Sequence, residues 1–139
     1  MFDNMKLFLV LASLAAVLVF AAGCSAGPTA NTEIQEGTYQ RIAASAVKER
    51  LDKGEKLIIL DVRTREEYDS GHVPNSILLP YDEVGAKASA LLPDKKATII
   101  VYCRSGRRSE IAAKDLLAMG YSKVADMGGV NNWTYGLVK

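Results

Sequence analysis

The stretch that most constrains the fold is a short apolar run that ends in a cysteine and is followed by a helix. Residues 99–102 read Ile-Ile-Val-Tyr, an uninterrupted apolar run typical of a buried parallel strand. Cys103 ends this run, and small and cationic residues follow it. Residues 109–119 carry apolar side chains at helical spacing before Gly120 ends the helix. The sequence therefore predicts Cys103 on a tight loop between a strand and the amino end of a helix.

The composition of this loop favours a negatively charged sulfur. The first turn of a helix offers unpaired N–H groups and partial positive charge, which stabilise an anion. Arg104, Arg107 and Arg108 add nearby cations, and Gly106 lets the loop amides curl toward one centre. Each feature alone also fits a small buried cysteine and solvated arginines. Together, with Ser105 completing residues 104–108, they predict a reactive thiolate at Cys103.

The rest of the chain alternates strands and helices. A second buried strand, residues 57–60, runs into Asp61 and Arg63, which we expect on the same rim as Cys103 because parallel strands align their carboxyl ends. Other predicted strands are residues 39–42, 77–79 and 123–125, and predicted helices are residues 46–53, 64–70, 82–92 and 109–119. This order predicts a three-layer α/β domain with a central, mostly parallel, five-stranded sheet flanked by helices.

The amino-terminal segment differs in kind from the rest. Residues 7–22 are apolar apart from Ser13, follow Lys6, and end in Ala-Ala-Gly before Cys24, which predicts a secretory signal. The end of this segment resembles a bacterial lipobox, although Ala21 stands where that motif most often has leucine. The resemblance implies cleavage after residue 23, lipid on the Cys24 sulfur, and an extracytoplasmic protein anchored to the cell membrane or the outer membrane. An uncleaved anchor is the alternative, for which the apolar run is short.

Composition limits the remaining choices. The chain has 139 residues and a formal charge of +1, which fits one domain and gives no bias toward nucleic acid. We expect a signal peptide at residues 1–23, a lipidated cysteine and flexible tether at 24–37, and the domain at 38–139. If Cys24 carries lipid, Cys103 has no cysteine left to pair with, and an unpaired cysteine in a secreted protein points to chemistry rather than to a disulfide. Clustered metal ligands are absent from the sequence, so neither a metal nor a cofactor is expected.

Residues 102–109, Tyr-Cys-Arg-Ser-Gly-Arg-Arg-Ser, resemble the active-site loop of rhodaneses, the thiosulfate sulfurtransferases. Further stretches resemble other signatures of that family, in order, from about residue 39 to the end. They are residues 60–63, Leu-Asp-Val-Arg; residues 66–68, Glu-Glu-Tyr; residues 71–77, Gly-His-Val-Pro-Asn-Ser-Ile; residues 120–121; residues 128–130; and Trp133.

The resemblance implies a chemistry and a set of roles. The Cys103 thiolate would take the outer sulfur of a small anionic donor such as thiosulfate and hold it as a persulfide, stabilised by the amides of residues 104–108. Cyanide in an assay, or a thiol, would then remove it. Arg107 and Arg108 would attract the donor, Asp61 and Arg63 would brace the loop, and His72 would belong to a structural turn. We expect no general base, because the loop itself lowers the pKa of the thiol.

Three other functions stay open at this point. A phosphatase or arsenate reductase of similar fold needs five residues between its cysteine and an arginine, whereas here Ser109 is six residues after Cys103 and Arg108 comes one earlier. The shorter loop suits a sulfur atom better than a phosphate. A persulfide carrier that serves a partner protein shares the same loop, so the sequence does not separate it from a free enzyme. An inactive adaptor is disfavoured because Cys103 is present.

Overall fold

A computed structural model describes residues 33–139. The predicted signal peptide at residues 1–23, the predicted lipidation site Cys24 and the first part of the predicted tether lie outside the described residues. Within the described part, none of the helices combines the length and the apolar character that crossing a membrane requires. The last residues of the predicted tether contact the domain: Ile34 packs against buried residues, and the Gly37 N–H donates to the Ser122 carbonyl oxygen at 2.8 Å.

The sheet consists of parallel strands in the spatial order β2-β1-β3-β4. Their bounds are β1 Leu57–Asp61, β2 Ile77–Leu78, β3 Thr98–Cys103 and β4 Lys123–Gly129. The predicted parallel α/β arrangement is confirmed, and β4 continues to Gly129, beyond the residues 123–125 predicted for it. Asp61 is the register partner of Tyr102, one residue before Cys103, so the two predicted rim positions do lie on neighbouring strands.

The prediction of five strands is wrong for the described residues, which contain four. The predicted strand at residues 39–42 meets β4 at a single parallel bridge between Arg41 and Asp126. Two backbone hydrogen bonds form there, from the Ile42 N–H to the Asp126 oxygen at 3.0 Å and from the Asp126 N–H to the Gln40 oxygen at 2.9 Å. The segment then leaves the sheet to enter the first helix, so no ladder develops.

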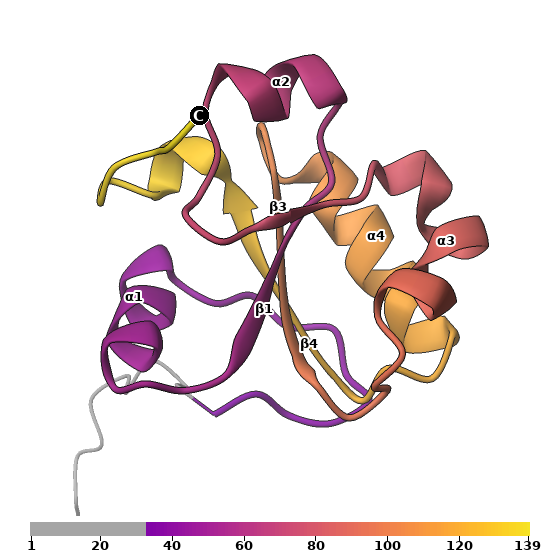
Figure 1. The fold of residues 1–139 in the computed structure, drawn as a ribbon. Coiled ribbons are helices and arrows are strands. Elements are labelled where there is room, and N and C mark those ends of the chain that lie inside the picture. The colour runs from indigo at the N-terminus through magenta and orange to yellow at the C-terminus, as the bar shows by residue number, and fades with distance from the viewer. Residues whose placement is uncertain (1–32) are drawn as a thin grey trace, which may run out of the picture.

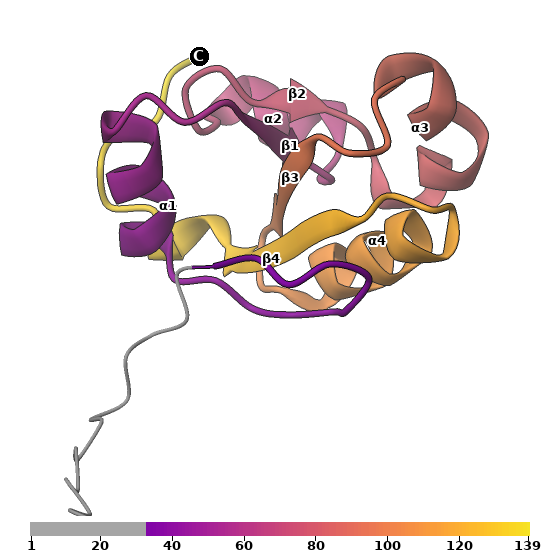
Figure 2. The same cartoon turned by 90° about the horizontal axis from the view of Figure 1, so that it is seen from below.

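Helices cover both faces of the sheet (Figures 1 and 2). Their bounds are α1 Ala44–Asp52, α2 Arg65–Ser70, α3 Val84–Leu91 and α4 Arg107–Ala118, with short 3₁₀ turns η1 Tyr81–Glu83 and η2 Val130–Asn132. Helix α1 lies on one face and α3 and α4 on the other, while α2 lies at the end where β1 finishes (Figure 1). Helix α4 begins at Arg107, two residues earlier than predicted, so the loop after Cys103 is only three residues long.

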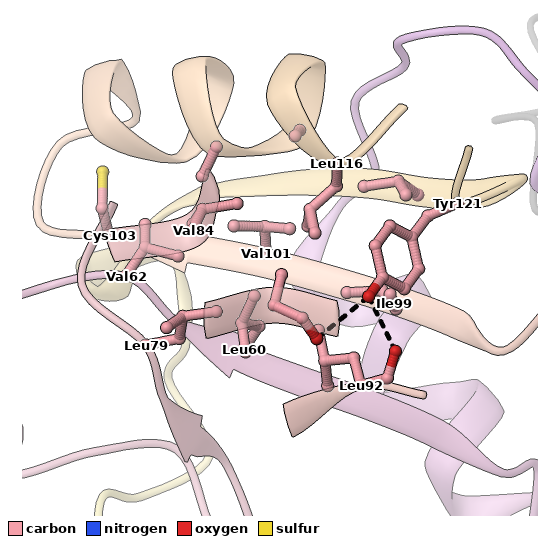
Figure 3. Packing of buried hydrophobic residues seen from close by; sticks show 14 residues of the cluster. Leu60, Val62, Leu79, Val84, Leu92, Ile99, Val101, Cys103, Leu116 and Tyr121 are labelled. Atoms are coloured by element: carbon pink, nitrogen blue, oxygen red, sulfur yellow. Dashed lines mark hydrogen bonds between the residues drawn. The ribbon is translucent and has the colours of Figure 1, made fainter. Parts of the chain in front are cut away.

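Strand residues alternate between two cores, one on each face of the sheet. The core under α3 and α4 holds Leu60, Val62, Ile99, Val101, Cys103 and Leu116, and the core under α1 holds Val47, Ile59, Ile100, Tyr102, Met127 and Trp133. In the first core the buried Tyr121 hydroxyl lies 2.7 Å from the Leu92 carbonyl oxygen and 3.0 Å from that of Ala88, which fixes the end of α3 (Figure 3). Burial of each large side chain contributes about 1.5–3 kcal/mol.

Gly129, at the end of β4, lets this strand pass directly beneath the loop that follows Cys103. A Cβ atom at Gly129 would lie 2.6 Å from the Arg104 carbonyl oxygen and 3.4 Å from the Ser105 Cα. The φ angle of Gly129 is −84°, which any residue adopts, so glycine is needed here for space rather than for conformation.

We predict that Gly129→Ala destabilises the protein by about 1–3 kcal/mol, because the added methyl group displaces loop backbone that cannot move cheaply. Gly85→Ala is the matched control: Gly85 is exposed in α3 with open space at its Cβ position, so this change should raise stability by up to about 1 kcal/mol. Chemical denaturation of both variants measures the difference. Equal stability of the Gly129→Ala variant and the unchanged protein would contradict the close contact.

Candidate active site

Cys103 is the last residue of β3 and is fully buried. Its register partner on β4 is Gly129, and its sulfur points toward the start of α4 (Figure 3). No other cysteine lies within the described residues, and Cys103 forms no disulfide there. Three residues, 104–106, separate it from α4, and the last of them, Gly106, hydrogen-bonds to its sulfur; we call these three residues the cover.

Main-chain and side-chain donors converge on the Cys103 sulfur. The Gly106 N–H donates to Sγ at 3.0 Å, and Gly106 adopts φ 103°, a left-handed conformation that favours glycine. Burial by itself raises the pKa of the Cys103 thiol. Hydrogen bonding with the Ser109 hydroxyl and with the amides of Ser109, Gly106 and Ser105 lowers the pKa by more than burial raises it. The net effect places the pKa of the thiol below its ordinary value.

Ser109 also hydrogen-bonds to the sulfur, and sequence reasoning missed it. Its buried hydroxyl oxygen accepts from the Cys103 thiol at 3.5 Å, and its hydroxyl donates to the Gly106 carbonyl oxygen at 3.0 Å. From the sequence, Ser109 was interpreted only as the residue six positions after Cys103 and as the first residue of the predicted helix. Once α4 is seen to begin at Arg107, a serine in its first turn faces back into the loop, which is the signal that identifies it.

The loop arginines divide into two kinds. Arg108 forms a bidentate ion pair with Glu67 of α2, with N–O distances of 2.7 and 2.8 Å, and both side chains are mostly buried. Arg104 and Arg107 are exposed, and no ion pair joins either of them to another residue between 33 and 139. Arg108 therefore ties the start of α4 to α2, while Arg104 and Arg107 remain at the surface.

Glu67 is placed for this role by a capping box at the start of α2. The Thr64 hydroxyl accepts from the Glu67 N–H, and the Glu67 carboxylate accepts from the Thr64 N–H at 3.0 Å. The hydrogen bond from Arg108 is the main reason that the pKa of Glu67 falls from 4.5 to about 2. The sequence predicted a helix at residues 64–70, which has Glu67 in its first turn, but not that the loop arginine reaches this residue.

Asp61 and Arg63 form a buried network beneath the loop and do not contact the sulfur. The Arg63 guanidinium donates to both carboxylate oxygens of Asp61 and, at 2.8 Å, to the Gly71 carbonyl oxygen. The Tyr102 hydroxyl donates to Asp61 at 2.5 Å and accepts from the Val73 N–H at 3.1 Å. Burial, followed by the bond to Asp61, raises the pKa of Tyr102 above its ordinary value. These contacts hold the residue before Cys103.

His72 lies away from the loop. Its ring stacks on Tyr68 with 3.7 Å between ring centroids, and its Nδ1 is 3.0 Å from the Tyr68 carbonyl oxygen. Its backbone exchanges two hydrogen bonds with Val138. Among residues 33–139, no group of three or more metal-ligating side chains lies close enough together to hold a metal ion.

Comparison with known proteins agrees with this geometry. The model of the Rhodanese-like domain matches residues 43–135. The chain belongs to the rhodanese-like family. A solved rhodanese from Escherichia coli, crystallised with anions, is 37% identical, with a TM-score of 0.57, and the match covers 60% of this chain and 99% of that one. The α/β arrangement described above is therefore the rhodanese-like fold.

Relatives within the rhodanese-like family include both enzymes and carriers. The thiosulfate sulfurtransferase PspE of E. coli is 39% identical over 80 residues, covering 58% of this chain and 77% of PspE. The putative sulfur carrier protein YrkF of Bacillus subtilis is 39% identical over 94 residues, covering 67% of this chain. The chain spans 50% of YrkF, and 20% of the adenylyltransferase and sulfurtransferase UBA4 of Candida albicans. Family membership thus supports sulfur transfer in general.

The ion pair between Glu67 and Arg108 predicts a pH-dependent contribution to stability. Because the pKa of Glu67 is depressed in the folded state, its contribution is complete above about 4.5 and is lost as the pH falls toward about 2. At neutral pH, Glu67→Gln should cost about 1–3 kcal/mol. Denaturation of both proteins along a pH series measures whether the difference shrinks between these two pH values.

Glu83→Gln is the control for this experiment, because Glu83 pairs with Lys87 on the surface of α3 and such pairs contribute about 0–1 kcal/mol. A destabilisation by Glu67→Gln no larger than that of Glu83→Gln, or one independent of pH, would show that the ion pair does not hold the loop.

Proposed function

We propose that this protein is a thiosulfate sulfurtransferase that carries sulfur as a persulfide on Cys103. The observation that carries the proposal is the convergence of the Gly106 amide, at 3.0 Å, and the Ser109 hydroxyl on a sulfur whose pKa is lowered. A thiolate is the nucleophile in this chemistry, and the same donors stabilise the negative sulfur that each half-reaction produces.

The first half-reaction loads the sulfur. The Cys103 thiolate attacks the outer sulfur of thiosulfate, the sulfur–sulfur bond of thiosulfate breaks, and sulfite leaves with the bonding electron pair. The outer sulfur remains on Cys103 as an anionic persulfide. The exposed Arg104 and Arg107 stand at the rim of the loop, where they attract the doubly charged donor. Because Cys103 has no exposed surface, the donor reaches Sγ when the short cover of residues 104–106 opens.

The second half-reaction discharges the persulfide to cyanide or to a thiol. The acceptor attacks the outer sulfur, and the Cys103 thiolate is the leaving group. A leaving group with a lowered pKa departs more readily, so the donors that activate Cys103 as a nucleophile also assist its release. No separate base is invoked for either step, because the hydrogen bonds at Sγ lower the pKa of the thiol and so favour the thiolate.

The second candidate is a persulfide carrier that delivers sulfur only to a partner protein. The similarity to the putative sulfur carrier YrkF favours it. The two functions differ in the discharge step: a carrier keeps its persulfide in the presence of small thiols and cyanide, whereas an enzyme turns over. Phosphate-ester hydrolysis has less support, because Arg108 is one residue closer to Cys103 than such enzymes require and is paired with Glu67.

We also propose that the protein is exported and anchored to a membrane by lipid on Cys24. Support comes from the apolar segment at residues 7–22 and the small residues directly before Cys24. An extracytoplasmic location would expose Cys103 to oxidants, and its complete burial beneath the loop would protect the thiol there.

The purified domain should form thiocyanate from thiosulfate and cyanide, and Cys103→Ser should abolish this activity, with a loss of at least about 10³-fold. The colorimetric thiocyanate assay measures both. Activity in the Cys103→Ser variant equal to that of the unchanged protein would disprove the mechanism. A persulfide that loads but is not removed by cyanide would favour the carrier instead.

A further inference from the structure

A cation from outside the loop lies against the loop. Arg41, from the segment that precedes α1, places its Nη2 atom 3.4 Å from the position that a Cβ would take at Gly106. Gly106 is the residue whose N–H donates to the Cys103 sulfur. Gly106 is thus close both to the Arg41 guanidinium and to the Cys103 sulfur. Sequence reasoning did not select Arg41, because the single bridge to Asp126 that positions it joins distant parts of the chain.

The Arg41 side chain is oriented by a hydrogen-bonded support. Its Nε donates to the Tyr39 hydroxyl at 3.3 Å, and that hydroxyl donates to the Asp126 carboxylate at 2.9 Å. Asp126 is fully buried and also accepts from the Gly128 N–H at 2.7 Å. Arg41 Nη2 lies 3.8 Å from Asp126, beyond hydrogen-bond distance, and the side chain is 62% exposed. The guanidinium is therefore held in place while remaining open to a ligand.

A cavity of about 470 Å³ opens beside this guanidinium. Its wall is mainly apolar, and its polar groups come from Arg41, Ser45, Asp126, Asn132 and Tyr135. An apolar wall with a few polar groups, at this volume, is typical of a site for a small organic molecule. Thiosulfate has only five heavy atoms, so this cavity is larger than the donor requires, and no residue from 103 to 109 lines it.

We propose that this cavity is the acceptor site and that it binds a low-molecular-weight thiol bearing a carboxylate, which pairs with Arg41. The inference rests on the proposed sulfurtransferase function. A planar guanidinium fork matches a carboxylate. Because buried Asp126 already balances part of the charge of Arg41, the site suits a singly charged carboxylate. Gly106 is close to Arg41 and donates to the sulfur, so the acceptor, like the donor, reaches Sγ when residues 104–106 open.

In the bound state the acceptor thiolate attacks the outer sulfur of the Cys103 persulfide. A new sulfur–sulfur bond forms on the acceptor, the bond between Sγ and the outer sulfur breaks, and its electron pair stays on Sγ. The acceptor enters as a thiol, and the proton that it loses on becoming the nucleophile returns to the transferred sulfur, so the acceptor leaves as a hydropersulfide and Cys103 returns to the thiolate. No external oxidant or reductant is consumed.

Single-turnover discharge tests this assignment. The protein is loaded with thiosulfate, freed of excess donor, and mixed with mercaptopropionate, which carries a carboxylate, or with mercaptoethanol, which is neutral. Arg41→Gln should slow discharge by mercaptopropionate about 10-fold and leave discharge by mercaptoethanol within about 2-fold. Comparing the variant with the unchanged protein for each thiol cancels the intrinsic reactivities of the two thiols.

Arg65→Gln is the matched control. The Arg65 side chain is 65% exposed and lies 3.8 Å from Asp69 on α2. Arg65→Gln therefore removes the same charge as Arg41→Gln, from an ion pair of the same length and similar exposure. This variant should discharge to both thiols at the unchanged rate. The acceptor site would be overturned if Arg41→Gln slowed discharge to both thiols equally. It would also be overturned if this variant slowed loading by thiosulfate and left discharge unchanged. Failure of the unchanged protein to load sulfur at all would instead refute the proposed function, and the acceptor site with it.

Discussion

The hydrogen bonds that reach the Cys103 sulfur are the interaction on which the rest of the structure depends. A buried thiol is normally more difficult to ionise than a free one, because a charge is costly in a poorly solvated site. Here the Gly106 amide and the Ser109 hydroxyl replace the lost water, and their effect exceeds that of burial. Such donors act only if the loop keeps its shape, so the surrounding contacts matter chiefly for the position of the loop.

Three separate supports fix that position. The ion pair between Arg108 and Glu67 ties the start of α4 to α2, across 41 residues of sequence. Beneath the loop, the Asp61 carboxylate holds both Arg63 and Tyr102, the residue before Cys103. Behind it, Gly129 brings β4 close to the loop backbone. Each support uses a different kind of force, namely charge pairing, buried hydrogen bonding and close packing.

Local sequence patterns predicted the elements whose causes are local. The apolar run ending at Cys103, the helix after it and the short helix that became α2 were all predicted from the spacing of the residues. The prediction of a fifth strand was wrong because residues 39–42 meet β4 at only one bridge, between Arg41 and Asp126. A short run of strand-forming residues does not show how many of them pair with a neighbouring strand. The sequence analysis expected Arg108 to attract the anionic sulfur donor. Its ion pair with Glu67 becomes apparent only in the folded structure, where α2 and α4 lie close together. Arg41 was missed for the same reason: tertiary contacts, not neighbours in sequence, place it beside Gly106.

The most direct measurement of the central claim is the titration of the Cys103 thiol, followed by the ultraviolet absorbance of the thiolate. The unchanged protein should titrate below the pKa of free cysteine, and Ser109→Ala should raise the pKa, because the side-chain hydrogen bond between Ser109 and Sγ, which lowers it, is lost. Ser105→Ala provides the comparison: it removes an exposed side chain but keeps the backbone amide, so the pKa should stay low. A Cys103 thiol that titrates like free cysteine, and that Ser109→Ala leaves unchanged, would contradict the account.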